Sequence, residues 1–182
     1  MEKQNFLDSL KLKDLWSETY GDSRIRLALL DGTVDCSHPS LAGASLIQLD
    51  SLTCTTTNEG VASQHGTHVV SLILGQHNSP VLGTAPNCQG ILIPIFRDGQ
   101  EGSLISCSQA ELALAINRAV EQGVHIINIS AGELSLSGIA EPILVEAVRN
   151  CVNAGILIVA AAGNQGCDCL NIPGALPSVL VV

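Results

Sequence analysis

Short apolar runs alternate with amphipathic segments along this chain, and this alternation limits its fold more than any other feature. The runs are rich in Leu, Ile and Val, as in strands that are buried on both faces. We expect strands at 24–30, 44–49, 90–96, 124–130, 156–161 and 178–182, and helices at 65–75, 108–122 and 142–153. Strands that alternate with helices form parallel sheets with helices on both faces. The sequence therefore predicts a three-layer α/β/α fold around a mostly parallel sheet.

Two of the predicted helices carry start signals. Ser108 and Glu111 have the Ser-x-x-Glu spacing of a capping box, and Pro142 suits the first turn of a helix. Residues 1–23 precede the first strand and have an amphipathic pattern, which predicts a helical arm. The expected organisation is an arm over 1–23 and an α/β domain over 24–182.

Charge and composition exclude some classes of partner. The 182 residues carry a net charge of −9 and only 2% aromatic residues, which argues against nucleic acid because binding there depends on Lys, Arg and stacking rings. No apolar run is long enough for a membrane span, and no secretory signal stands at the start. We therefore expect a cytoplasmic protein with no membrane partner. The sequence does not indicate its oligomeric state.

The cysteines and histidines give no clear metal site. Seven cysteines occur, at 36, 54, 88, 107, 151, 167 and 169. No Cys-x-x-Cys pair is present, so most are expected to be reduced, small buried side chains. A disulfide or a metal held by Cys167 and Cys169 is the alternative. A His65–His68 metal pair lacks an evident third ligand, and the sequence predicts neither a metal nor a cofactor.

Polar residues follow three of the predicted strands, and a histidine, His65, opens the predicted helix at 65–75. Ligands and catalytic groups of open α/β sheets lie at the carboxyl ends of strands, which draws attention to Asp31, Ser130 and Asn164. Taken alone, Asp31 and Asn164 suit turns, and His65 suits a helix start. Together, a carboxylate, a histidine and a hydrogen-bond donor are what a serine hydrolase needs beside its nucleophile.

The motifs around these residues resemble those of a known family. They are LALLDGTVD around Asp31, QHGTHVVSLILG around His65, GTAPNC at 83–88, IINISAGE at 126–133 and VAAAGNQG at 159–166. In content and order, residues 24–182 resemble the subtilisin-like serine proteases, the peptidase S8 family. The resemblance implies that Asp31 orients His65, that His65 is the general base, and that Asn164 stabilises the oxyanion.

The resemblance also implies where a peptide would bind. Residues Ser130, Ala131 and Gly132 would form an edge that pairs with the main chain of the substrate, with Gly102 and Ser103 opposite. The family more often has Leu-Gly-Gly after this serine. Ala131 and Glu133 depart from that pattern, which predicts an altered specificity pocket.

The nucleophile of the family is missing from this sequence. In the family it is a serine in a Gly-Thr-Ser motif several tens of residues after the oxyanion asparagine, whereas only 18 residues follow Asn164 here and no Gly-Thr-Ser occurs. Residues 24–182 would then be a partial peptidase domain, incomplete at its C-terminus and inactive by itself. The alternatives are a truncated gene product, a partial sequence of an active enzyme, and a non-catalytic pseudoprotease that binds peptides.

A narrower resemblance concerns the proteases of cyanobactin biosynthesis, which process ribosomal precursor peptides. It rests on LLDGTVDCSHPSL, CQGILIPIF, CSQAELALAINRAVEQGVHIINISAGEL and AAAGNQGCDCLNIPGALPSVLVV. The macrocyclising type carries a helical insertion between the aspartate and the histidine, but Asp31 and His65 are only 34 residues apart. The resemblance thus implies the type that removes the N-terminal leader, with the macrocyclase as the alternative. A nucleotide-binding α/β domain has little support because no Gly-x-Gly-x-x-Gly follows the first strand.

Overall fold

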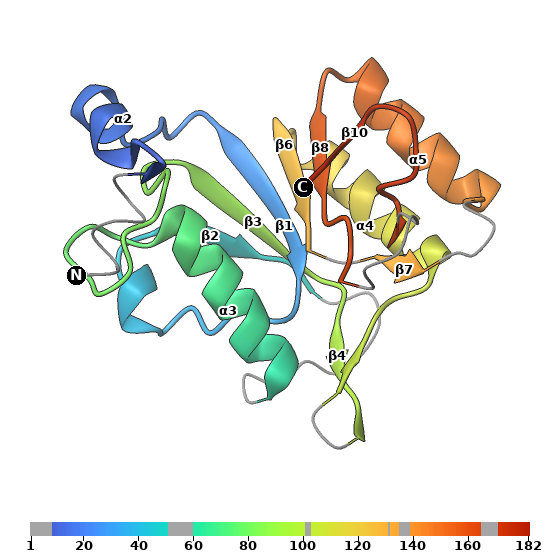
Figure 1. Cartoon of the computed structure of the whole chain (residues 1–182), viewed down its shortest axis with the longest axis horizontal. Coiled ribbons are helices and arrows are strands. Elements are labelled where there is room, and N and C mark those ends of the chain that lie inside the picture. Colours follow the sequence, from blue (N-terminus) through green and yellow to red (C-terminus); the bar gives the residue numbers. More distant parts are fainter. Residues whose placement is uncertain (1–8, 51–59, 101–102, 131, 135–138, 165–170) are drawn as a thin grey trace.

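A six-stranded parallel sheet forms the centre of the computed structural model, which describes residues 9–50, 60–100, 103–130, 132–134, 139–164 and 171–182 (Figure 1). The strands are β1 (Arg26–Asp31), β2 (Ser45–Gln48), β3 (Gln89–Pro94), β6 (Ile126–Ile129), β8 (Leu157–Ala160) and β10 (Val179–Val181). Their order is β10-β8-β6-β1-β3-β2, and every neighbouring pair is parallel. All six strands predicted from the apolar runs are confirmed.

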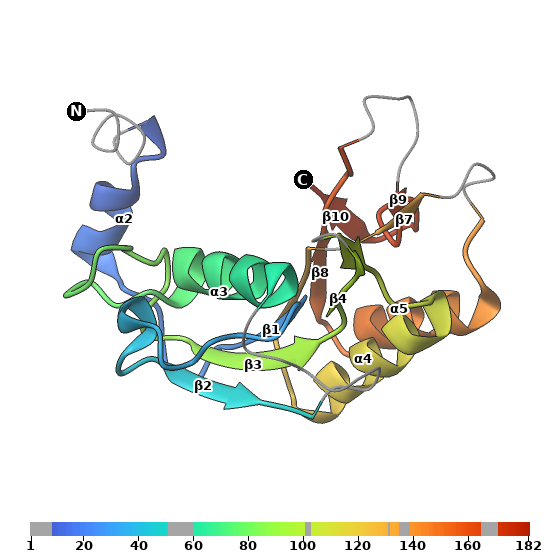
Figure 2. The same cartoon turned by 90° about the horizontal axis from the view of Figure 1, so that it is seen from below.

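Helices cover the sheet on both sides. Helix α3 (Val61–Leu74) lies on one face, and α4 (Gln109–Glu121) and α5 (Pro142–Asn153) lie on the other (Figure 2). The predicted three-layer α/β/α arrangement is therefore confirmed. The smaller elements are η1 (Pro39–Leu41), the hairpin of β4 (Arg97–Asp98) with β5 (Leu104–Ile105), and the pair of β7 (Glu133–Leu134) with β9 (Asn171–Ile172). Within the described residues, no helix has the length and apolarity that crossing a membrane requires.

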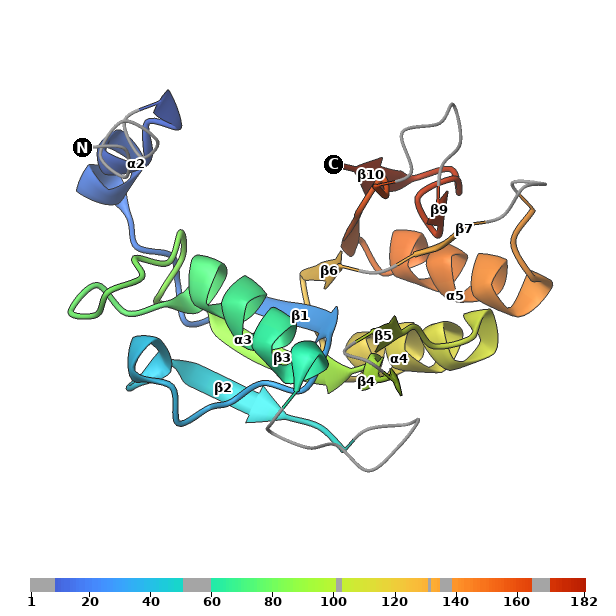
Figure 3. The same cartoon turned by 60° about the horizontal axis from the view of Figure 1, so that its bottom comes forward.

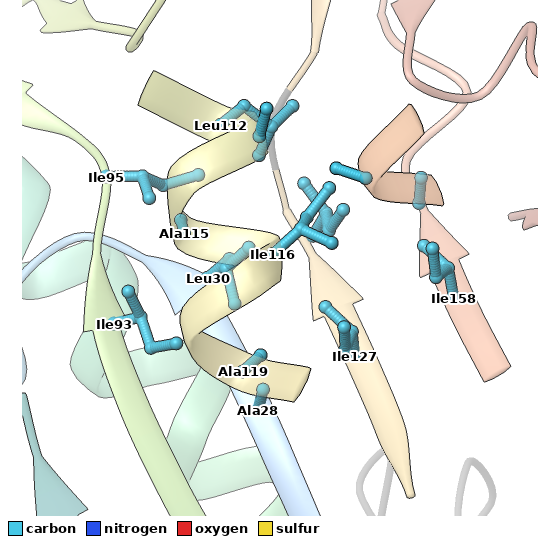
Figure 4. Close-up of a cluster of buried hydrophobic side chains, with 14 of the residues drawn as sticks. Ala28, Leu30, Ile93, Ile95, Leu112, Ala115, Ile116, Ala119, Ile127 and Ile158 are labelled. Atoms are coloured by element: carbon cyan, nitrogen blue, oxygen red, sulfur yellow. The ribbon is translucent and has the colours of Figure 1, made fainter. Parts of the chain in front are cut away.

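The main core lies between the sheet and α4 with α5. Figure 4 shows Leu112, Ile116 and Ala119 of α4 facing Leu30 and Ile127 of the sheet. Helix α4 begins at the predicted capping box. There the backbone N–H of Glu111 donates to the Ser108 hydroxyl at 3.2 Å, and the Glu111 carboxylate accepts from the backbone N–H of Ser108 at 2.7 Å. This second bond lowers the pKa of Glu111.

Helix α3 begins four residues before its predicted start. Its N-cap is Gly60, which has no side chain, and the first-turn N–H of Ala62 instead donates to the Asp98 carboxylate at 2.9 Å. A capping group that lies 36 residues away leaves no local start signal, which explains the error.

The N-terminal arm contains helix α2 (Leu12–Glu18), set apart from α4 and α5 (Figure 3). Trp16 is its buried residue, and the indole N–H donates to the Thr84 carbonyl at 3.1 Å. The His77 ring packs edge-on against Trp16 and Tyr20, at centroid distances of 4.5 and 4.8 Å. These contacts attach the arm to the loop after α3.

Helix α3 packs unusually close to the turn that follows β1. A Cβ on Gly66 would lie 2.5 Å from the Gly32 carbonyl oxygen, and a Cβ on Gly32 would collide with the Ala62 carbonyl. Nearby, the Asp35 N–H donates to the Thr67 hydroxyl at 2.9 Å. The two backbones are therefore in direct contact, which only glycine permits at positions 32 and 66.

The α3 face of the sheet is covered over one half only. Helix α3 lies over the β1–β3–β2 half, and no described helix lies over β6, β8 and β10 on that side (Figure 1). Leu157 and Leu180 on this side are 45% and 51% exposed, whereas Ile158, which faces α5, is 1% exposed. Apolar side chains of β8 and β10 are therefore exposed on this side of the described chain.

A Gly66→Ala substitution should destabilise the protein, although helix propensity alone predicts a gain of about 1 kcal/mol. The added methyl group meets the Gly32 carbonyl, and such overpacking costs about 1–3 kcal/mol. Denaturant unfolding measures the difference. Gln64→Ala, at an exposed position of the same helix, should stay within about 0.5 kcal/mol of the unchanged chain. A Gly66→Ala chain more stable than the parent would contradict the close contact.

Neighbouring residues of β8 should differ strongly in their contribution to stability. Ile158→Ala removes a buried side chain and should lower the free energy of unfolding by about 2–5 kcal/mol. Leu157→Ala removes a half-exposed one and should cost less than about 1 kcal/mol. Equal losses in denaturant unfolding would mean that the α3 side of β8 is covered in solution.

Candidate active site

Asp31 and His65 form a hydrogen-bonded pair at the carboxyl edge of the sheet. Asp31 is the last residue of β1 and is 1% exposed, and His65 lies in the second turn of α3. His65 Nδ1 is 2.6 Å from Asp31 Oδ1, which also accepts the Gly32 N–H at 2.6 Å. The structure thus brings together two residues that are 34 positions apart in the sequence.

The chemistry of the pair sets the tautomer of the histidine. A carboxylate only accepts hydrogen bonds, so the ring donates through Nδ1 and its Nε2 is left with a lone pair. The His65 side chain is 39% exposed, so the ring is accessible while its carboxylate partner is buried. Asp31 Oδ2 is also buried and has no hydrogen-bond partner among the described residues. A buried carboxylate beside a half-open imidazole is suited to general-base catalysis.

The two residues that follow β3 contact both members of this pair. The backbone carbonyl of Asp31 accepts the N–H groups of Ile95 and Phe96, at 2.7 and 3.3 Å. The Phe96 ring packs edge-on against His65, with centroids 6.2 Å apart. The apolar run predicts a strand that continues to Phe96, so Phe96 is not among the predicted site residues. Because β3 ends at Pro94, opposite Asp31, residues 95 and 96 also follow a strand at the carboxyl edge.

Ser130 follows β6, the neighbour of β1, and Asn164 follows β8, the neighbour of β6. Register pairs Leu30 with Ile129, and Ile129 with Ala160, so the residues after β1, β6 and β8 leave the sheet at the same edge. The Ser130 hydroxyl accepts from the Asn128 side-chain amide at 2.8 Å. Asn164 is exposed, four residues past β8. Its oxyanion role stays a prediction.

Gly132 borders an open cavity of about 550 Å³. Arg97, Cys107 and Glu141 are among its other lining residues. Gly132 also packs against the side chain of Asn171, a buried polar residue that no sequence pattern predicts here, because a Cβ at position 132 would collide with it. Ala131 lies outside the described residues. The peptide-binding role of 130–132 stays a prediction.

The opposite edge, predicted at Gly102 and Ser103, falls in the β4–β5 hairpin. Gly102 lies outside the described residues. Ser103 is exposed, and its hydroxyl donates to the Gln100 carbonyl at 2.8 Å. Ser103 does not line the cavity beside Gly132. Its substrate-binding role is likewise a prediction.

The described part of the chain offers no metal-binding cluster, and two of its thiols are unreactive. No three His, Cys, Asp or Glu side chains in that part are placed to hold a metal ion. Burial raises the pKa of Cys151 to about 11, and burial with Asp35 nearby raises the pKa of Cys36. Both thiols are therefore protonated at neutral pH and poor nucleophiles. Cys88 and Cys151 are buried, as predicted, whereas Cys36 is exposed.

Known proteases are similar to this chain in sequence and in fold. Residues 22–182 match the family model described as the Subtilase family. The chain is 33% identical over 183 residues to the major intracellular serine protease of Bacillus subtilis (strain 168), covering 95% of this chain and 54% of that protein. It is 38% identical over 161 residues to a thermostable alkaline protease of Halalkalibacterium halodurans, covering 86% of this chain and 40% of that protein. The chain therefore spans about half the length of these relatives.

Solved structures of cyanobactin maturation proteases are also similar. The prenylagaramide maturation protease PagA is 46% identical, with a TM-score of 0.81, over 93% of this chain and 57% of that one. The patellamide maturation protease PatA is 49% identical, with a TM-score of 0.76, over 88% and 56%. The PatG macrocyclase domain is 28% identical, with a TM-score of 0.79, over 96% and 62%. The chain belongs to the subtilase family of serine proteases and is related to the cyanobactin maturation proteases.

Proposed function

We propose that this chain is part of a subtilisin-like serine endopeptidase that removes the leader from a ribosomal precursor peptide in cyanobactin-type biosynthesis. The observation that carries the proposal is the Asp31–His65 pair, with Nδ1 and Oδ1 2.6 Å apart at the carboxyl edge of the sheet. A buried carboxylate that orients an accessible imidazole is the acid–base half of a serine protease triad.

Degrees of similarity favour leader removal over macrocyclisation. The chain is 46–49% identical to PagA and PatA but 26–28% identical to the PatG structures. The 34 residues between Asp31 and His65 also leave little room for the helical insertion of the macrocyclising type. The proposed partner is a precursor peptide, and the proposed location is the cytoplasm, where ribosomal peptides are made.

The proposed reaction uses each residue at a defined atom. His65 Nε2 takes the proton of a serine hydroxyl as its oxygen attacks the peptide carbonyl, and the Nδ1–H of the ring stays bonded to Asp31. The side-chain amide of Asn164 donates to the tetrahedral oxyanion. The proton on Nε2 then passes to the leaving amine, and a water molecule, activated by the same nitrogen, hydrolyses the acyl-enzyme.

The nucleophilic serine is proposed to come from residues beyond Val182. Two observations support this: no hydroxyl hydrogen-bonds to His65 Nε2 within the described residues, and the matched proteases are about twice as long as the matched part. The uncovered apolar side of β6, β8 and β10 lies next to the site and offers a surface for such a segment. A hollow of about 260 Å³ there is lined by Ile73, Ala85, Ile126 and Val159, among others.

Substitutions in the longer gene product test the assigned roles. His65→Ala should lower kcat for a leader-containing peptide by on the order of 10⁴–10⁶, because it removes the base. Asn164→Ala should lower kcat by about 10²–10³ with little change in KM, because it removes one oxyanion donor. His68→Ala is the control, since His68 is exposed on the same helix, and it should keep full activity. Near-full activity of His65→Ala would refute the assignment.

Labelling of the 182-residue chain tests where the nucleophile lies. A fluorophosphonate probe reacts with activated serines, so it should label the longer gene product and leave residues 1–182 alone unlabelled. Mass spectrometry of the labelled product should place the modified serine beyond Val182. A longer product that binds the precursor peptide but neither cleaves it nor reacts with the probe would instead indicate a pseudoprotease.

A further inference from the structure

Helix α3, which carries His65, begins without a capping group of its own. Its N-cap is Gly60, with φ of 136° and no side chain, so among the described residues no neighbouring side chain accepts the first-turn N–H groups. Unsatisfied N–H groups make the first turn of a helix prone to fray. His65 lies only four residues after the first helical residue, Val61. Fraying of this turn would therefore reach the position of the imidazole.

Asp98 supplies the missing acceptor from another part of the chain. Its Oδ1 accepts the Ala62 N–H at 2.9 Å, and its negative charge suits the positive end of the helix. The carboxylate lies directly against Gly60, where a Cβ would collide with it. Gly60 and Asp98 are thus fitted to each other. Figure 3 shows β4, which contains Asp98, next to the beginning of α3.

The segment that contains Asp98 also contacts the other side of the His65 site. Phe96, two residues earlier, packs edge-on against the His65 ring. Arg97 lines the cavity beside Gly132. Three consecutive residues therefore contact the imidazole, the cavity and the start of α3. This arrangement indicates that Asp98 affects the His65 site as well as the start of the helix.

We propose that Asp98 is a positioning residue for His65: by capping α3 at Ala62 it keeps the imidazole within hydrogen-bond distance of Asp31. Asp98 acts through the helix backbone, and no direct contact between Asp98 and the reacting atoms is required. Asp98 lies outside the motifs that carry the resemblance. Its positioning role rests on the geometry of the Gly60–Asp98 pair and holds whether or not the proposed leader cleavage is correct.

NMR of the 182-residue chain tests the proposal without any need for turnover. The His65 Nδ1 proton, held in a short hydrogen bond to a carboxylate, should give a separate low-field signal. In Asp98→Ala, that signal should broaden or vanish, and exchange of the Ala62 amide proton should become about five- to tenfold faster, the loss expected for one helix cap. In Asp98→Asn, the side-chain oxygen still accepts, so both should stay near their parental values.

Ser108→Ala is the matched control for a purely structural effect. It removes the cap of α4, a helix of 13 residues on the other face of the sheet, whereas α3 has 14. It should lower the Tm about as much as Asp98→Ala does and leave the His65 signal unchanged. If Asp98→Ala also leaves the His65 signal unchanged while its Tm falls, Asp98 has a structural role only and the proposal is wrong.

A measurement on the unchanged chain covers the case in which Asp98→Ala does not fold. On warming, the Ala62 amide should begin to exchange over the same temperature range in which the His65 Nδ1 proton signal is lost. A His65 signal that persists after the Ala62 amide has lost protection would overturn the proposal.

Discussion

The site depends on direct backbone contact between helix α3 and the turn after β1. Gly32 and Gly66 permit this contact, because a Cβ at either position would overlap a carbonyl group of the other segment. At this separation, His65 reaches Asp31 with a 2.6 Å hydrogen bond, and Asp31 is 1% exposed. A wider separation would admit water to the carboxylate and weaken its hold on the imidazole. The glycines in Asp-Gly and His-Gly-Thr-His therefore let the two backbones come close enough for this hydrogen bond to form.

The two faces of the sheet contribute in different ways. The face under α4 and α5 holds the larger core, which includes residues of β1, β6 and β8. These three strands pair in register. Register in turn places the residues after these strands at one edge. The other face is covered by α3 over β1, β3 and β2, while Leu157 and Leu180 are about half exposed. The candidate catalytic groups meet at the carboxyl edge of the sheet, where Asp31 ends β1 and His65 comes from α3 on the partly covered face.

The strands and two helix starts were predictable because they depend on local patterns, whereas the pairing of Asp31 with His65 was expected from the resemblance to the subtilisin-like proteases. Buried strands read as apolar runs, and the Ser108–Glu111 capping box uses residues three apart. The start of α3 was not predictable, since its cap is Asp98, from another part of the chain. Phe96 was overlooked for a related reason: the apolar run continues past Pro94, although pairing with β1 ends there.

By itself, the sequence determined the α/β class, the order of strands and helices, and the residue types available for acid–base chemistry. It could do so because burial pattern and local hydrogen bonding act over a few neighbouring residues. Only the tertiary structure decided the strand order in space, the 2.6 Å contact of His65 with Asp31, and the capping of α3 by Asp98. These depend on close packing between segments more than thirty residues apart, where a single methyl group decides whether two backbones meet.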